Sequence, residues 1–128
     1  MRMMLKIVIP TETGNQAIKD GSLHKIFEAA MSKLKPEAAY FFPEHGLRSA
    51  MMVFDMNDAS EIPTIAEPLF AGLNARLQLQ PVMNADDLKK GLERVKQAMS
   101  VDGPPLPAAL VDRGIEVIAG DVQQRRQL

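Results

Sequence analysis

The stretch that most constrains the fold of this chain is residues 36–58, PEAAYFFPEHGLRSAMMVFDMND. Two segments rich in strand-forming residues, 38–42 and 50–54, flank the polar tetrapeptide Pro43-Glu44-His45-Gly46. A glycine at this place accepts the positive φ that tight hairpin loops require. The pattern therefore predicts a β-hairpin that supplies two inner strands of one small sheet.

A strand and a helix are expected before this hairpin. In residues 3–10 both alternating sets are mainly apolar, with Lys6 as the charged member, which is typical of a strand covered on both faces. Residues 11–20 are polar, and Ser22 is expected to cap the helix that follows. This helix should end at Lys35, because a proline comes next. Its apolar stripe comprises Leu23, Ile26, Phe27, Ala30, Met31 and Leu34.

Two helices and a strand are expected after the hairpin. Ser60 is expected to cap the first of these helices, and Pro68 in its middle should bend or split it. Residues 76–82 alternate as a fourth strand, which Pro81 places at a sheet edge. Asn84 is expected to cap the last helix, which has acidic residues in its first turn. The two apolar stripes are Ile62, Ile65, Ala66, Leu69, Phe70 and Leu73, and then Leu88, Leu92, Val95 and Met99.

The predicted order of elements is β-α-β-β-α-β with one further helix, which defines a ferredoxin-like α+β fold. In such a sheet the strand order is 4-1-3-2, both crossover helices lie on one face, and the other face is open. Here the open face is expected to be largely apolar, which soluble monomers rarely tolerate. We therefore expect a homodimer, or a higher oligomer, whose sheets pack face to face. The expected apolar residues are Met4 and Val8, Tyr40 with Phe42 or Phe41, and Met51 with Val53 or Met52 with Phe54.

Composition excludes several classes of partner. The 128 residues carry 15 basic and 16 acidic side chains without a long run of one sign, so neither nucleic acid nor an anionic membrane surface is an expected partner. Because there are no cysteines, a disulfide framework, thiolate catalysis and cysteine-ligated metals are excluded. The first residues, MRMMLKIVIPT, contain only a short apolar run, so no signal peptide or membrane span is expected. The expected location is the cytoplasm.

Five segments carry a resemblance to a known group of proteins: PEAAYF, GLRSAMMVFDM, IAEPLF, LNARLQLQPVM and ADDLKKGL. In this order they resemble an uncharacterised bacterial family of the dimeric α/β-barrel superfamily, over residues 3–99. The resemblance implies a domain at residues 1–100 that forms a dimeric α/β barrel with a cleft between its two sheets. The superfamily includes muconolactone isomerase-like enzymes, cofactor-free quinone-forming monooxygenases, and haem-degrading and chlorite-processing proteins. It therefore implies no particular reaction.

Residues 101–128 differ from the rest of the chain and lie outside the resemblance. They begin with the linker-like sequence Asp102-Gly103-Pro104-Pro105. One interpretation is a loosely docked tail. The other is that residues 114–120 add a strand to an exposed sheet edge, on this chain or on a partner subunit.

Four candidate ligand-binding residues are expected on the open face of the sheet. Lys6, Gln78 and Gln80 share the less apolar face of two strands that pair in this topology, and Tyr40 adds a hydroxyl group. Polar groups that become buried must find partners. These side chains therefore either contact a ligand or form an internal hydrogen-bond network. For Lys6, the expected partners within the chain are Tyr40, Gln78, Gln80 and Glu67.

Three further candidates are His45, Arg48 and Glu67. The hairpin residue His45, next to an acidic residue, is either a general acid or base at the mouth of the cleft or part of a solvated turn. Arg48 and Glu67 either pair with each other or bind a carboxylate and position a water molecule. Neither histidine has carboxylates at metal-ligand spacing, so no metal site is expected. No Gly-rich phosphate loop or dinucleotide motif is present, and no cofactor is expected.

Two classes of function follow from these expectations. The first is a homodimeric binding or assembly module whose inter-sheet cleft holds a small apolar or carboxylated molecule. The alternative is a cofactor-free isomerase-like or monooxygenase-like enzyme that acts on a small ring compound. In that alternative Lys6, Tyr40, His45 or Glu67 serves as acid or base.

Overall fold

The computed structural model describes residues 1–99. These residues fall into two units, one of residues 1–82 and one that begins at Met83 and contains α4 (Ala85–Met99). Each unit is described by itself. The predicted addition of residues 114–120 to a sheet edge lies outside the described residues.

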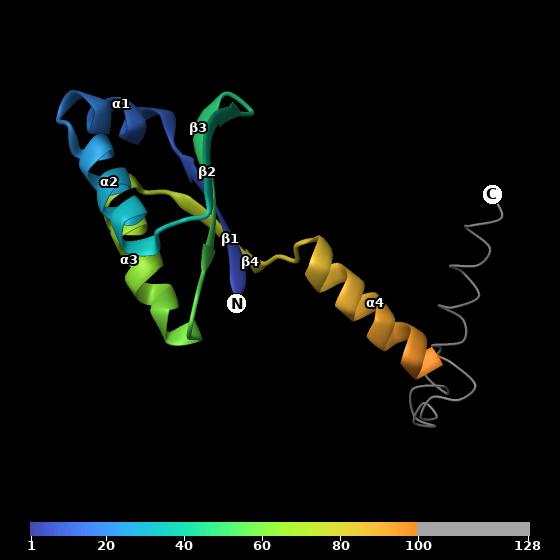
Figure 1. The fold of residues 1–128 in the computed structure, drawn as a ribbon. Helices are drawn as coiled ribbons and strands as arrows, with labels where there is room; N and C mark the ends of the chain where they lie inside the picture. The colour runs from blue at the N-terminus through green and yellow to red at the C-terminus, as the bar shows by residue number, and fades with distance from the viewer. Residues whose placement is uncertain (100–128) are drawn as a thin grey trace, which may run out of the picture. The chain divides into compact units, whose positions relative to one another are not determined.

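The first unit contains one antiparallel sheet of four strands (Figure 1). The strands are β1 (Arg2–Ile9), β2 (Ala38–Glu44), β3 (Leu47–Asp55) and β4 (Arg76–Pro81). Their order is β2-β3-β1-β4, which confirms the predicted 4-1-3-2 arrangement. The expectation that both hairpin strands are inner strands is wrong for β2, which lies at an edge because β1 occupies the other side of β3.

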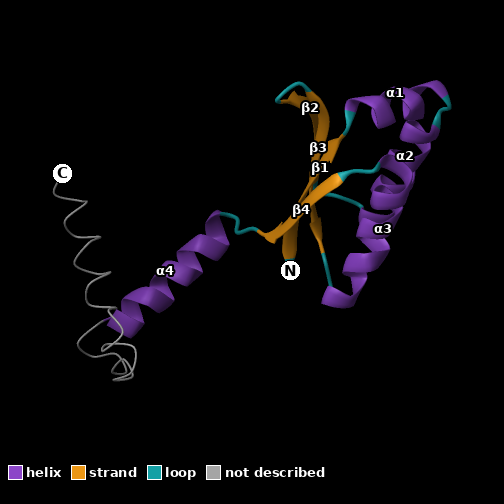
Figure 2. Cartoon of the chain, turned by 180° about the vertical axis from the view of Figure 1, so that it is seen from behind, coloured by secondary structure: helices purple, strands orange, loops and turns teal. Residues whose placement is uncertain are grey.

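Three α-helices cover one face of this sheet (Figure 2). They are α1 (Thr11–Lys19), α2 (Ser22–Leu34) and α3 (Ile62–Leu73), the last preceded by a short 3-10 helix, η1 (Ala59–Glu61). The chain is thus an α+β protein whose sheet topology is compatible with a ferredoxin-like fold. The first crossover contains two helices, α1 and α2, where the sequence predicted one.

The core lies between the sheet and these helices. Alternate residues of β1, namely Met3, Leu5, Ile7 and Ile9, are each at most 5% exposed. They face the helices together with alternate residues of β3, because successive side chains of a strand point to opposite faces. The remaining buried core residues are Ala17, Ala50, Met52, Phe54, Met56, Ile65, Leu69, Leu73 and Ala75.

The predicted N-caps at Ser22 and Ser60 are wrong, by one residue and by two residues respectively. The N–H of Ser22 donates to the carboxylate of Asp20 at 2.8 Å, and α2 begins at Ser22 after Gly21, whose φ is 79°. In the same way the N–H of Ser60 donates to Asp58 at 2.9 Å, and η1 begins at Ala59. The N-cap of η1 is therefore Asp58, whereas the N-cap of α2 is Gly21, with Asp20 accepting from the Ser22 N–H one residue before that cap. The helix predicted to follow the hairpin is α3, and it is not split, since it continues through Pro68.

The hairpin turn is shorter than expected, since its strands extend to Glu44 and from Leu47. The two residues between them, His45 and Gly46, have φ values of 50° and 79°. Two successive positive φ values are typical of the type I′ turn, whose twist matches that of the flanking strands. The prediction that Gly46 adopts a positive φ is confirmed.

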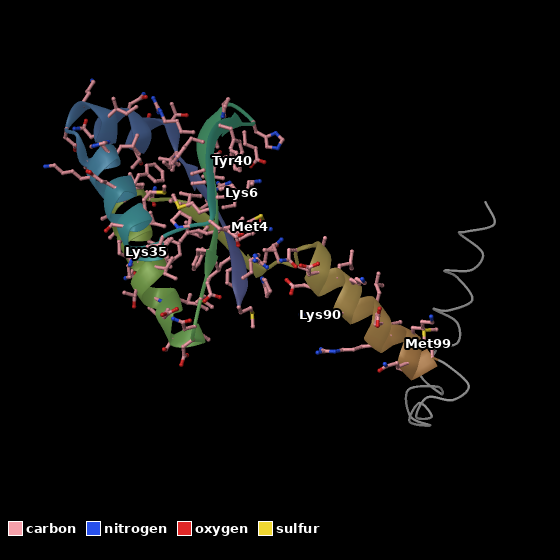
Figure 3. The ribbon with its side chains drawn as sticks, viewed as in Figure 1. Met4, Lys6, Lys35, Tyr40, Lys90 and Met99 are labelled. Atoms are coloured by element: carbon pink, nitrogen blue, oxygen red, sulfur yellow. The ribbon has the colours of Figure 1, made fainter. Side chains whose placement is uncertain are left out.

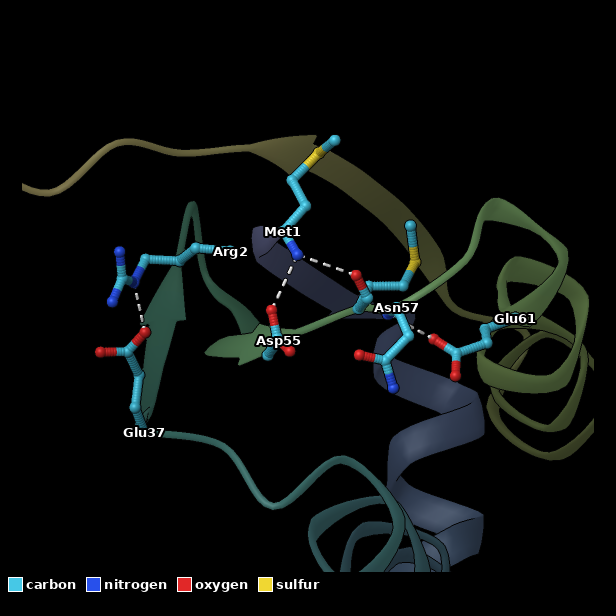
Figure 4. A network of polar contacts seen from close by, with 7 residues as sticks. Met1, Arg2, Glu37, Asp55, Asn57 and Glu61 are labelled. Carbon is cyan, nitrogen blue, oxygen red and sulfur yellow. Dashed lines mark hydrogen bonds and ion pairs between the residues drawn. The ribbon is translucent and has the colours of Figure 1, made fainter. Parts of the chain in front are cut away.

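Polar contacts join the strand ends at the start of the chain (Figure 4). The terminal ammonium group of Met1 donates to Asp55 at 2.8 Å and to the Met56 carbonyl at 3.0 Å. Arg2 Nε donates to Glu37 at 2.5 Å. These contacts connect β1 with the end of β3 and with the residue that precedes β2.

Both edge strands of the sheet contain a proline. Pro43 is the second-to-last residue of β2, and Pro81 is the last residue of β4. The predicted edge position of the strand that contains Pro81 is confirmed. Proline has no backbone N–H, so neither of these positions can donate to a further strand.

The helix of the second unit, α4, begins with a reciprocal pair of hydrogen bonds. The N–H of Asp87 donates to the Asn84 side chain at 2.8 Å, and the N–H of Asn84 donates to the Asp87 carboxylate at 3.1 Å. This is the geometry of a capping box, and it confirms the predicted cap at Asn84. In the described part of the chain, no helix combines the length and the apolar content needed to cross a membrane.

Candidate functional site

The open face of the sheet is defined by the strand register. Lys6 of β1 lies opposite Met51 of β3 and Gln78 of β4, and Met51 in turn lies opposite Tyr40 of β2. These four side chains form a central row across the sheet, on the side away from the helices. Figure 3 shows Lys6 and Tyr40 on that side, with Met4 beside them.

Two further rows flank the central one. The first contains Ala38, Val53, Met4 and Gln80, and the second contains Phe42, Ser49, Val8 and Arg76. The register resolves the alternatives left open by the sequence: Phe42, Met51 and Val53 belong to the open face, whereas Met52 and Phe54 are buried on the helix side. The face is therefore mainly apolar over β2, β3 and β1, with Lys6 and Ser49 as polar members, and polar along β4.

Lys6 is held by a partner that the sequence analysis did not assign to it. Its Nζ lies 2.5 Å from the carboxylate of Glu44, and the two side chains are 25% and 30% exposed. Partial burial strengthens such a charge-assisted bond relative to one in water. The acceptor is Glu44 because β2 continues past Pro43 and carries this residue onto the open face. None of the four partners expected for Lys6 takes this place, namely Tyr40, Gln78, Gln80 and Glu67.

The remaining polar residues of the open face are more exposed. Gln78 Nε2 donates to Gln80 Oε1 at 3.0 Å, so these two side chains bond to each other along β4. Tyr40 is 62% exposed. The central row thus brings Lys6, Tyr40 and Gln78 onto one surface, as the sequence predicts.

Arg48 lies on the opposite side of the sheet. Its guanidinium group donates to the Asn15 side chain at 2.9 Å and to the Thr11 carbonyl at 3.4 Å, so it joins β3 to α1. The sequence alternatives included a pair between Arg48 and Glu67. The structure instead gives Arg48 partners in α1, a helix that the sequence analysis did not predict.

His45 and Glu67 are also separate from the central row. His45 is an exposed residue of the hairpin turn, and Glu67 is exposed on α3, which covers the other face of the sheet. The four residues considered as acid or base are therefore distributed over the open face, a turn and a helix. In residues 1–99, no group of three or more His, Asp or Glu side chains is placed to hold a metal ion.

Glu44, which the sequence placed with His45 in the hairpin turn as a possible acid or base, lies instead at the end of β2 on this face. The sequence could have indicated this position. If the predicted strand 38–42 is extended by two residues, Glu44 falls in the same alternating set as Tyr40 and Phe42. Treating Pro43 as the start of the turn removed Glu44 from the strand. An edge strand tolerates proline, so the extension was physically allowed.

These elements define an α+β chain in which an antiparallel sheet carries helices on one face and a mainly apolar second face. A comparison with protein-family models finds no match, and a search of curated proteins finds no significant similarity. Among solved structures, one similar chain is a formyltetrahydrofolate deformylase from Pseudomonas putida KT2440, with 12% identity and a TM-score of 0.43. The match covers 80% of this chain and 40% of the deformylase chain. The fold assignment rests on the strand order and connections, and not on this match.

Proposed function

We propose that this protein is a homodimeric assembly module whose two copies pair through the open faces of their sheets. The observation that carries the proposal is the placement of α1, α2 and α3 on one face only (Figures 1 and 2). In the unit of residues 1–82, no helix covers the opposite face, which presents Met4, Val8, Tyr40, Phe42, Met51 and Val53. Contiguous apolar surface of this kind favours association.

The size of this face suits a dimer interface. Its four strands have 6 to 9 residues each. With strands about 4.8 Å apart and a rise of about 3.4 Å per residue, the face measures roughly 20 by 24 Å in projection. Because side chains project from the sheet, the accessible area of the face is larger than this projection. It is on the order of the ~800 Å² that each partner buries in a standard interface.

A second copy of the chain is the occupant that the chemistry of this face favours. A twofold axis brings the same patch of each copy together, so the apolar surface over β1, β2 and β3 meets its own equivalent. The polar row of Arg76, Gln78 and Gln80 along β4 then lies toward the rim, where polar residues are usual in interfaces. The resemblance to the dimeric α/β-barrel superfamily supports the same arrangement.

The Lys6–Glu44 pair favours assembly over capture of a carboxylate ligand at this face. Lys6 already has a carboxylate partner within its own chain, and an acidic ligand would have to displace Glu44. The paired charges can enter an interface at lower cost than a lone ammonium group, because an unpartnered charge loses its hydration without compensation.

Light scattering of the whole chain at micromolar concentration tests the proposal. We expect twice the 14.1 kDa mass of the single chain. Tyr40→Glu, at a position 62% exposed in the single chain, should fold and shift the mass toward 14.1 kDa. A wild-type protein that is monomeric at these concentrations would overturn the proposal, as would a Tyr40→Glu variant with unchanged mass.

A further inference from the structure

A second feature of residues 1–82 lies on the helix side of the sheet, near the hairpin. It is a hollow of about 440 Å³ lined by Ile9, Leu23, Phe27, Phe41, Pro43 and Arg48, among others. An adjoining hollow of about 380 Å³ shares Leu23, Phe27 and Phe41 and extends to His24. Both hollows lie between α2 and the edge strand β2, and the first is also lined by Phe42 and Ser49, whose row belongs to the open face.

Two aromatic rings form one wall of this hollow. The rings of Phe27 and Phe41 meet edge to face, with centroids 5.5 Å apart and an interplanar angle of 83°. Phe41 nevertheless remains 58% exposed, although its side chain points to the helix side of the sheet. A bound apolar group would cover this ring without displacing any core residue.

Arg48 places a positive charge in a wall that is otherwise apolar. Its contacts to Thr11 and Asn15 fix the guanidinium group against α1 and use two of its five N–H groups. A guanidinium group held in this way is suited to bind a carboxylate with little further loss of side-chain freedom. The other walls offer apolar and aromatic surface, so the site combines one anchor for an anion with a place for a hydrocarbon body.

We propose that this hollow binds a small apolar monocarboxylate, with its carboxylate on Arg48 and its apolar body against Phe27 and Phe41. The hollow is open to solvent, so the ligand would rest against its wall, and the volume of about 440 Å³ is sufficient for a ligand of this size. Because the hollow has one cation and an otherwise apolar wall, it should favour a ligand with one negative charge over a polyphosphate or a polar sugar. The proposal requires no second copy, since the residues that would hold the ligand, Phe27, Phe41 and Arg48, lie on the helix side of the sheet.

Titration with 3-phenylpropanoate, followed by calorimetry and by NMR shifts of the full-length protein, tests the proposal. The neutral analogue 3-phenylpropanamide is the matched control probe, because it keeps the ring and loses the charge. We expect the acid to bind about tenfold more tightly than the amide, as a charge-assisted hydrogen bond implies. The shifted resonances should include Phe27, Phe41 and Leu23.

Two variants locate the binding. Arg48→Met should reduce affinity for the acid about tenfold and leave affinity for the amide unchanged. Phe41→Ala, at an exposed ring, should fold normally and weaken both probes. Lys33→Met, which removes an exposed cation near the other end of α2, is the control and should bind the acid as the wild type does.

The proposal is overturned by any of three results on the wild type: no saturable binding of the acid, equal binding of acid and amide, or shifts confined to residues outside the hollow. An Arg48→Met variant that retains full affinity for the acid also overturns it. Because the acid–amide comparison uses the wild type alone, the test does not depend on the stability of the Arg48 variant. A failure here leaves the solution mass unaffected and is thus distinguishable from failure of the dimer proposal.

Discussion

Lys6 in β1 and Glu44 in β2 form an ion pair that spans the intervening strand β3, although the two residues are 38 positions apart in the sequence. The lysine side chain reaches along the apolar surface with its methylene groups and ends on the carboxylate near the hairpin turn. The pair therefore couples an inner strand to the edge strand without a backbone hydrogen bond between them.

A double-mutant cycle on this pair should give a coupling energy of about 0.5 to 1 kcal/mol, because both side chains are partly exposed. Lys6→Met and Glu44→Gln should each lower the free energy of unfolding, and the double variant should be more stable than the two single effects predict. Urea denaturation at one fixed protein concentration measures all four proteins. Strict additivity would show that the pair contributes no net stability.

Val53→Asp should separate the subunits while leaving the fold intact. Val53 lies on the open face between Met4 and Ala38, so an aspartate there is tolerated in water and is strongly unfavourable in a dry interface. We expect the dimer dissociation constant to rise roughly 100-fold or more. Sedimentation equilibrium measures this change, and far-UV circular dichroism reports the fold. Ile18→Asp, at an exposed position on α1, is the matched control and should keep the wild-type mass.

The hairpin turn should respond in opposite directions to substitutions at its two residues. Gly46→Ala should lower the free energy of unfolding by about 1 kcal/mol, because φ at this position is 79°. His45→Asn should raise it by about 0.5 kcal/mol, since asparagine adopts the left-handed conformation more readily. Thermal unfolding of both variants checks the prediction. A Gly46→Ala variant as stable as the wild type would contradict the assigned turn.

Asp20 and Asp58, which accept hydrogen bonds where α2 and η1 begin, should make part of the stability depend on acid pH. The hydroxyl and then the N–H of Ser22 lower the pKa of Asp20 below its ordinary value of 3.8, and the N–H and then the hydroxyl of Ser60 lower the pKa of Asp58 below 3.8. Because the folded state holds the proton less tightly than the unfolded state, this stability is complete above pH 3.8 and is lost as the pH falls through the lowered values.

Urea midpoints measured between pH 2 and pH 6 test this dependence. Asp58→Asn keeps a capping acceptor but cannot titrate, so its midpoint should fall less than that of the wild type as the pH decreases. Glu67→Gln is the comparison at an exposed carboxylate that caps no helix. Identical pH profiles for the wild type and Asp58→Asn would contradict the assigned role of Asp58.

Most of the sheet could be predicted from the sequence because each strand is a short run of strand-forming residues bounded by turn or helix signals. The strand order followed from the β-α-β-β-α-β order of elements, which is that of a ferredoxin-like fold. The faces of β2 and β3 remained ambiguous, because Phe41, Phe42, Met51 and Met52 are all apolar. Only the register separates them, since a shift of one residue exchanges the two faces.

Helix α1 is present in the structure but was not predicted from the sequence. Residues 11–20 contain Thr, Gly and Asn, which favour helices weakly, and its buried residues are only Gly14 and Ala17. Neither residue gives a hydrophobic stripe. The position of α1 depends instead on tertiary contacts, among them the bonds from Arg48 to Thr11 and Asn15. For the same reason the sequence analysis did not find the hollow, whose lining comes from four separate elements.

The prolines in both edge strands have a consequence for the behaviour of the protein at high concentration. A sheet that recruits further strands at its edges can grow without limit into fibrils, and each new strand needs an uninterrupted row of donors. Pro43 and Pro81 each remove one donor near the end of that row, at the two edges of the sheet. Growth by edge addition is thereby hindered, whereas pairing of two faces stops at two copies. The sheet of residues 1–82 can therefore present an apolar face while its two edges resist the addition of further strands.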